Sequence, residues 1–114
     1  MILVLFEATI KEACMDSYLA MAGKLKDSLS GAKGFIRSER FSSLVNKRKL
    51  LSLSVWESEE AVDAWHNQHE HRRSQQEGRS TIFESYTVTV ADPFRSYTDR
   101  ERQEAPPDSN ALFL

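Results

Sequence analysis

The sequence predicts an α+β domain with the ferredoxin-like element order βαββαβ, two copies of which close into a dimeric α+β barrel. Segments of strand type and helix type follow one another in that order, and the first strand is apolar on both faces. With 114 residues, the chain is long enough for one core and too short for two. We expect the domain to span residues 1–97 and a polar tail to span residues 98–114.

The opening strand, residues 2–10, is apolar at every even position and also at Leu3 and Leu5. A strand with one solvent-exposed face alternates apolar and polar residues. This strand does not, so we expect other parts of the protein to pack against both of its faces. The last strand, residues 81–91, carries Tyr86, Val88 and Val90 on one face and is also too apolar for a bare sheet. A second copy of the sheet supplies the missing cover, and we therefore expect a homodimer.

A helical period occupies residues 15–30. Its apolar stripe consists of Met15, Tyr18, Ala22, Leu25 and Leu29. Gly31 and Gly34 end this helix. The segments 35–41 and 49–56 then form an antiparallel hairpin, and the second of them alternates leucines and Val55 with serines, as a half-buried strand does.

The second helix starts after Ser58, a good N-cap residue, with Glu59 and Glu60 at the positive end of the helix dipole. Its sequence becomes polar after Trp65, and Gly78 ends it.

Composition excludes several function classes. Fifteen basic and seventeen acidic residues give a net charge of −2, which disfavours nucleic-acid binding. No segment approaches the about 20 apolar residues that cross a bilayer, and no basic leader precedes the first strand, so we expect a cytoplasmic protein without a membrane partner. The single Cys14 excludes an internal disulfide, and no glycine-rich phosphate loop is present.

One stretch of the chain carries a recognisable set of motifs. In order, they are Trp56 at a strand end, the acidic pair Glu59 and Glu60, Ala61 and Trp65, the pair Glu70 and His71, and the closing Gly78 and Arg79. These features resemble the antibiotic biosynthesis monooxygenase (ABM) family. The resemblance covers about residues 1–97 and is most distinctive over 54–90. It implies a dimeric barrel that oxidises quinols or polycyclic phenols with dioxygen and needs no cofactor, although other members bind or degrade heme.

The resemblance makes His71 the candidate catalytic base. An imidazole titrates near neutrality and can accept a proton from a phenol, whose electron-rich anion then passes an electron to dioxygen. Trp65 is the second catalytic candidate, as a flat wall for an aromatic substrate. The alternatives are that Trp65 only fills the core, and that Glu70, His71 and Arg79 form a structural polar network.

The predicted substrate-binding residues are Trp65, His69, Phe83, Tyr86 and Glu7. Glu7 is an acid in an otherwise apolar strand, where it acts either as a general base or as an ion-pair partner of Arg37 or Arg40.

His66, His69 and His71 cluster in sequence, but a regular helix cannot direct all three at one ion, so we expect no metal site. The heme-degrading members of the family use an Asn on the first strand, where this chain has Glu7. Heme breakdown is therefore not expected. The alternative to an oxygenase is a non-catalytic dimeric barrel that binds a hydrophobic ligand or heme.

Overall fold

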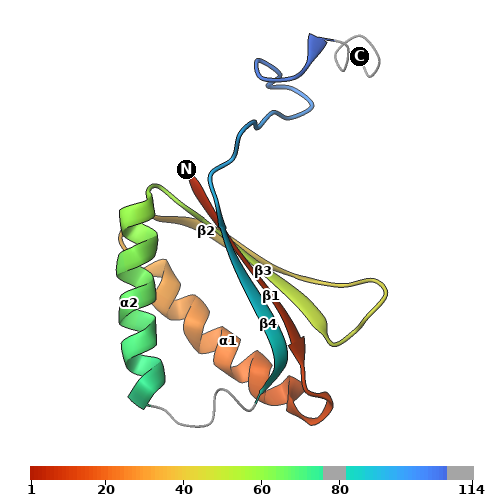
Figure 1. Ribbon diagram of the computed structural model, residues 1–114, viewed down its shortest axis with the longest axis vertical. Helices are drawn as coiled ribbons and strands as arrows, with labels where there is room; N and C mark the ends of the chain where they lie inside the picture. Colours follow the sequence, from red (N-terminus) through yellow and green to blue (C-terminus); the bar gives the residue numbers. More distant parts are fainter. Residues whose placement is uncertain (76–81, 108–114) are drawn as a thin grey trace.

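The computed structural model describes the backbone of residues 1–75 and 82–107, and their side chains except those of residues 69–75. In chain order the elements are β1 (Ile2–Ile10), a 3-10 turn (Glu12–Cys14), α1 (Met15–Ser30), β2 (Phe35–Ser42), β3 (Lys49–Trp56), α2 (Glu59–Gln75) and β4 (Phe83–Ala91). The strands form one antiparallel sheet in the order β2-β3-β1-β4, and both helices lie on one face of it (Figure 1). The predicted α+β ferredoxin-like fold is confirmed.

Two local features join the helices to the sheet. Gly34 has a φ of +84°, and a Cβ placed on it would lie 2.5 Å from the Cβ of Ala61, so only glycine allows the connection between α1 and β2 to approach α2 this closely. The carbonyl oxygen of Gly34 accepts a hydrogen bond of 2.8 Å from the backbone N–H of Glu57. Ser58 caps α2 as predicted, because its Oγ accepts the N–H of Ala61 at 3.2 Å.

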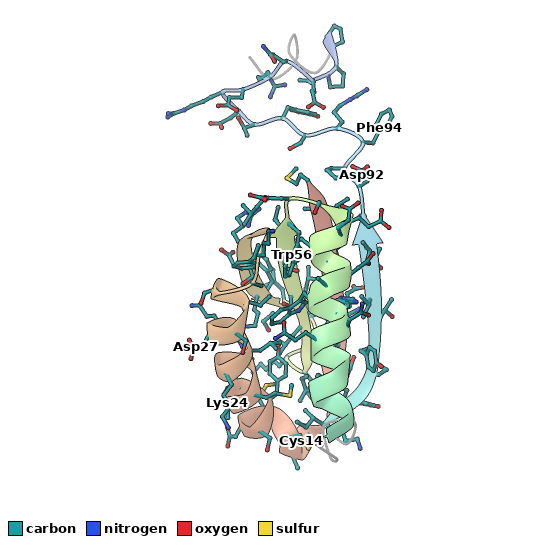
Figure 2. All side chains as sticks on the ribbon, turned by 90° about the vertical axis from the view of Figure 1, so that its left-hand side faces the viewer. Cys14, Lys24, Asp27, Trp56, Asp92 and Phe94 are labelled. Atoms are coloured by element: carbon teal, nitrogen blue, oxygen red, sulfur yellow. The ribbon has the colours of Figure 1, made fainter. Side chains whose placement is uncertain are left out.

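The core between helices and sheet consists of two separate clusters of buried side chains. The Trp56 cluster contains Val4, Leu29, Trp56 and Val62. The Tyr18 cluster contains Ala8, Ile10, Tyr18 and Ala22, and Cys14 packs against it. Figure 2 places Trp56 in the upper half of the domain and Cys14 at its lower end, so the two clusters fill opposite ends of the space between the layers.

The polar side chains in the middle of β3 point toward the helices, and its apolar side chains point away from them, which is the reverse of the usual arrangement in a half-buried strand. Its serines, Ser52 and Ser54, pair with Phe6 and Val4 of β1 and therefore lie on the helix side of the sheet. Leu51, Leu53 and Val55 consequently point to the face that carries no helix. The alternation predicted from the sequence is present, but its apolar side is turned away from the helices.

The helix-free face is apolar in its centre and polar along β4. Its central residues are Leu3, Leu5, Leu51, Leu53 and Val55. Along β4, Thr87 and Thr89 pair with Glu7 and Leu5 and so share this face, whereas Val88 pairs with Phe6 on the helix side. The apolar row of the last strand, which contains Tyr86, Val88 and Val90, therefore lies on the helix side, where it is partly exposed, and the apolar residues of the helix-free face come from β1 and β3.

Beyond β4 the chain runs away from the layered domain (Figure 1). Phe94 is 91% exposed, and the local order of this segment comes from contacts within it, such as the N–H groups of Arg100 and Glu101 that donate to Thr98 Oγ1. The sheet ends at Ala91, and the domain limit at residue 97 stays a prediction. No helix in the described part of the chain is long and apolar enough to cross a membrane.

Candidate functional site

A cavity of about 630 Å³ lies between the two helices and the sheet. The sheet contributes Val4 and Phe6 of β1, residues 38–42 of β2, Leu50, Ser52 and Ser54 of β3, and Phe83 and Val88 of β4. The helices contribute Tyr18, Leu19, Met21, Ala22, Leu25 and Lys26 of α1, and Trp65 and His66 of α2. Its volume lies in the range of about 300–1,000 Å³ that is typical of small-molecule sites.

The cavity exists because the floor between the two core clusters carries small side chains. Ser38 of β2 is in register with Ser54, and Ser54 with Val4, while the next row contains Ser52 and Phe6. A serine fills much less space than the leucines on the other face of β3, so the helices bridge a gap here. The Ser54 hydroxyl also accepts a 2.9 Å hydrogen bond from the buried indole N–H of Trp56, which fixes that ring in the core.

Aromatic rings bound the cavity at both ends. At the upper end the Trp65 ring lies 6.0 Å from the Trp56 ring, so it packs on the core and lines the cavity at once. At the lower end the Phe6 and Phe83 rings are 5.5 Å apart, edge to face, and the Tyr18 ring lies 6.1 Å from Phe83. A flat, largely apolar molecule fits between such walls.

The lining carries serine hydroxyls and a smaller set of titratable side chains, most of which are nitrogen bases. Lys26, Arg40 and His66 line the cavity, and Glu39 is the one acid among the described lining residues. Glu39 is in register with Leu53, so it belongs to the helix-free side of its strand, whereas Arg40 is in register with Ser52 on the cavity side.

The structure brings three of the predicted binding residues together. Trp65 and Phe83 line the cavity, and Tyr86 extends the lower aromatic group, with its ring 5.5 Å from Phe6 and 5.9 Å from Phe83. Tyr86 is 49% exposed, so it stands at the edge of this group. His69 and His71 belong to α2, but their side chains lie outside the described residues.

Glu7 does not join these residues. It is exposed on the helix-free face, in register with Leu51 and Thr87. The predicted alternative of an ion pair between Glu7 and Arg40 is wrong, because Arg40 lies on the other side of the sheet. Arg37 shares the face of Glu7 but is in register with Val55 rather than Leu51, and no ion pair joins Glu7 to Arg37 within the described residues.

The predicted binding set omitted the basic lining residues Lys26, Arg40 and His66 and the serines of the floor. The available signal for Arg40 was its spacing of two residues from Ser38 and from Ser42, which places all three side chains on one face of the strand. This spacing identifies lining residues only once it is known that this face of β2 meets the helices. Among the described side chains, those of residues 1–68 and 82–107, no three from His, Cys, Asp or Glu gather closely enough to hold a metal ion.

The model of the family described as antibiotic biosynthesis monooxygenase matches residues 1–77. This chain belongs to the ABM family. The jasmonate monooxygenase ABM of Pyricularia oryzae is 32% identical over 101 residues, which cover 89% of this chain. The match covers 47% of that relative, so this chain spans about half its length.

Solved structures of the ABM type share the fold. The crystal structure of an antibiotic biosynthesis monooxygenase superposes with a TM-score of 0.68 at 18% identity and covers 82% of this chain and 98% of its own. A variant of MhuD, crystallised with two manganese protoporphyrin IX bound per active site, gives a TM-score of 0.69 at 10% identity and covers 86% of this chain and 99% of its own. At these identities the similarity supports the fold alone.

Proposed function

We propose that this protein is a monooxygenase that oxidises a small aromatic molecule, a quinol or a fused-ring phenol, with dioxygen and without a cofactor. The observation that carries the proposal is the aromatic-walled cavity between α1, α2 and the sheet, in a chain that belongs to the ABM family. Trp65 and Phe83 offer surfaces against which a planar ring stacks.

In this reaction the substrate supplies all the electrons. Loss of a proton gives an electron-rich anion that reduces dioxygen; one oxygen atom then forms a bond to ring carbon, and the other leaves as water with the two hydrogens that the substrate gives up. A quinol thus becomes a hydroxyquinone, and no outside reductant is required. The protein contributes a base and a site that holds the ring near dioxygen.

The base is an imidazole of α2. His71 is the residue that the family resemblance favours, and His66 is the imidazole on the described lining. The test is oxygen uptake with a panel of hydroquinones, fused-ring phenols and, because of the Pyricularia oryzae relative, jasmonate. We expect removal of the base by His71→Ala or His66→Ala to slow turnover by about 10²-fold or more.

Trp65→Phe keeps a ring in the cavity and is expected to raise KM more than it lowers kcat. His69→Ala removes the third imidazole of α2, a predicted substrate contact, and is likewise expected to raise KM more than it lowers kcat. Turnover that is unchanged in both His66→Ala and His71→Ala would show that the base is wrongly assigned, and no uptake with any member of the panel would remove the proposed activity.

A second candidate is heme binding without catalysis. His66 is an imidazole on an otherwise mainly apolar lining, which is a donor set that suits a porphyrin iron, and the MhuD variant of similar fold binds a metal porphyrin. Heme titration tests this function: a Soret shift that His66→Ala abolishes, and that ascorbate does not bleach, supports binding without breakdown. An unchanged Soret band excludes it.

We propose in addition that a second copy covers the helix-free face, where Leu5 and Leu53 are neighbours in register. Sedimentation at micromolar concentration should give a dimer, and Leu53→Glu should give a folded monomer by circular dichroism. Thr89→Glu, in the same row but on the polar margin, is the control and should stay dimeric. A wild-type monomer contradicts this arrangement.

A further inference from the structure

From the lining of the cavity we infer that its substrate carries a carboxylate, which Arg40 and Lys26 bind at the mouth while the apolar body lies deeper against Phe6 and Trp65. This inference rests on the proposed function only in that the cavity is the binding site. It adds the chemical class of the ligand and the residues that select it.

Arg40 lies where such a group is needed. In the sheet, Arg40 is in register with Ser52 and Ser52 with Phe6, and all of them line the cavity. Strand β2 is an edge strand, and Arg40 is exposed, so its guanidinium marks the rim rather than the interior. An anion held there keeps part of its hydration and avoids the cost of a fully buried charge.

Lys26 adds a second cation from the opposite layer. It lies one turn after Ala22 on α1 and directly after Leu25, both of which line the cavity. Lys26 is exposed as well. A ligand that enters between α1 and β2 therefore passes one basic side chain from each layer.

The charge of these two cations is not balanced within the described residues. The one ion pair found there joins Arg48 to Glu84, and the single acid of the lining, Glu39, belongs to the other face of β2. Cations that have no acidic partner among the described residues, and that lie beside an apolar lining, favour an amphipathic anion over a neutral hydrocarbon or a cation.

A carboxylate suits this arrangement better than a larger anion. The planar guanidinium of an arginine matches the two oxygens of a carboxylate with parallel hydrogen bonds. The serine hydroxyls of Ser52 and Ser54 continue as a narrow polar strip from Arg40 across the floor, and the rest of the lining is mostly apolar. Such a strip accommodates one further hydroxyl or keto oxygen of the ligand.

The test compares two probes of the same shape by calorimetry: 1-naphthaleneacetate, which carries the carboxylate, and 1-naphthaleneethanol, which is neutral. We expect the acid to bind about tenfold more tightly than the alcohol at low salt, and this preference to shrink at high salt. Arg40→Gln should weaken the acid about tenfold and leave the alcohol unchanged, and Lys26→Gln should act in the same direction.

Matched controls are present on the same elements. Arg37→Gln removes an arginine of β2 from the helix-free face, and Lys24→Gln removes an exposed lysine of α1 that does not line the cavity. Both should leave the two affinities unchanged. Equal affinities for acid and alcohol, or equal effects of Arg40→Gln and Arg37→Gln, would overturn the inference and leave the proposed monooxygenase intact.

A further variant tests whether the probes bind in the cavity at all. Ala22→Phe fills the cavity, so it should abolish binding of both probes while circular dichroism shows that the variant keeps the fold. If both probes bind the Ala22→Phe variant as they bind the wild type, or if neither binds the wild type, the cavity is not the binding site. Both the inference and the location of the proposed reaction are then wrong.

Discussion

Replacing Gly34 by alanine should destabilise the fold strongly, because two independent costs meet at this position. Its φ of +84° is a left-handed conformation that costs an L-residue about 1–2 kcal/mol. The added Cβ also lies 2.5 Å from the Cβ of Ala61, far inside an ordinary carbon–carbon contact of about 3.5–4.0 Å. Relieving such overpacking costs about 1–3 kcal/mol more.

The two costs add to about 2–5 kcal/mol, a large share of the about 5–15 kcal/mol that stabilises a domain. With a urea m-value of about 2 kcal/mol/M, a loss of 3 kcal/mol lowers the unfolding midpoint by about 1.5 M. The measurement is urea denaturation followed by circular dichroism at one fixed protein concentration, since a dimer's stability depends on concentration.

Gly23→Ala is the matched control. Gly23 lies in the middle of α1, and a Cβ there meets nothing within 4 Å, so this variant should gain about 0.5–1 kcal/mol from helix propensity. The double variant Gly34→Ala with Ala61→Gly removes the clash and keeps only the backbone cost. A midpoint for Gly34→Ala at or above that of the wild type would refute the close approach of the α1–β2 connection to α2.

Three further changes test the framework around the cavity. Ser58→Ala removes the cap of α2 and should lower the free energy of unfolding by about 1 kcal/mol, measured by the same urea titration. Trp56→Ala, at a side chain only 1% exposed, should cost about 3–5 kcal/mol; a loss below 1 kcal/mol would contradict its place in the core. Glu84→Gln removes the charge of an ion pair with Arg48 whose side chains are 42% and 56% exposed, and it leaves the Arg48 hydrogen bond to the carbonyl oxygen of Ile10, so the unfolding free energy should change by less than about 1 kcal/mol.

The elements of the fold were predictable because each depends on a local pattern. The strand at residues 49–56 and the helix at residues 15–30 have the predicted bounds, since a change of hydrophobic period marks each boundary. The cap at Ser58 and the turn at Gly34 were predictable for the same reason, because a side-chain oxygen or a missing Cβ acts over only a few residues.

The site was less predictable, because it depends on which face of each strand meets the helices. Ser52 and Ser54 look like solvent-facing positions when a strand is considered alone, yet they form the floor of the cavity. Glu7 looks like a buried acid near the site, yet strand pairing turns it to the opposite face. The alternation of apolar and polar residues shows which side chains share a face of a strand, but it does not show which face meets the helices. A shift of one residue in strand register exchanges the two faces.

Arg40 and His66 illustrate the same limit at single positions. Their polarity makes both of them look like surface residues, and only the packing of α2 and β2 around the gap brings them to the cavity. Trp65 was easier to assign, since a large ring on an amphipathic helix must meet either the core or a bound molecule, and here it meets the core and lines the cavity.

Because the core is divided into the Trp56 cluster and the Tyr18 cluster, the residues that stabilise the fold are largely different from those that line the middle of the cavity. The buried side chains lie at the two ends, whereas the serines of the cavity floor lie between them and the basic side chains lie at its rim. Exchanges in that middle region should leave the architecture standing while altering which molecules are accepted. Such a scaffold suits deliberate redesign of its ligand preference, because substitutions in the cavity floor leave both buried clusters in place.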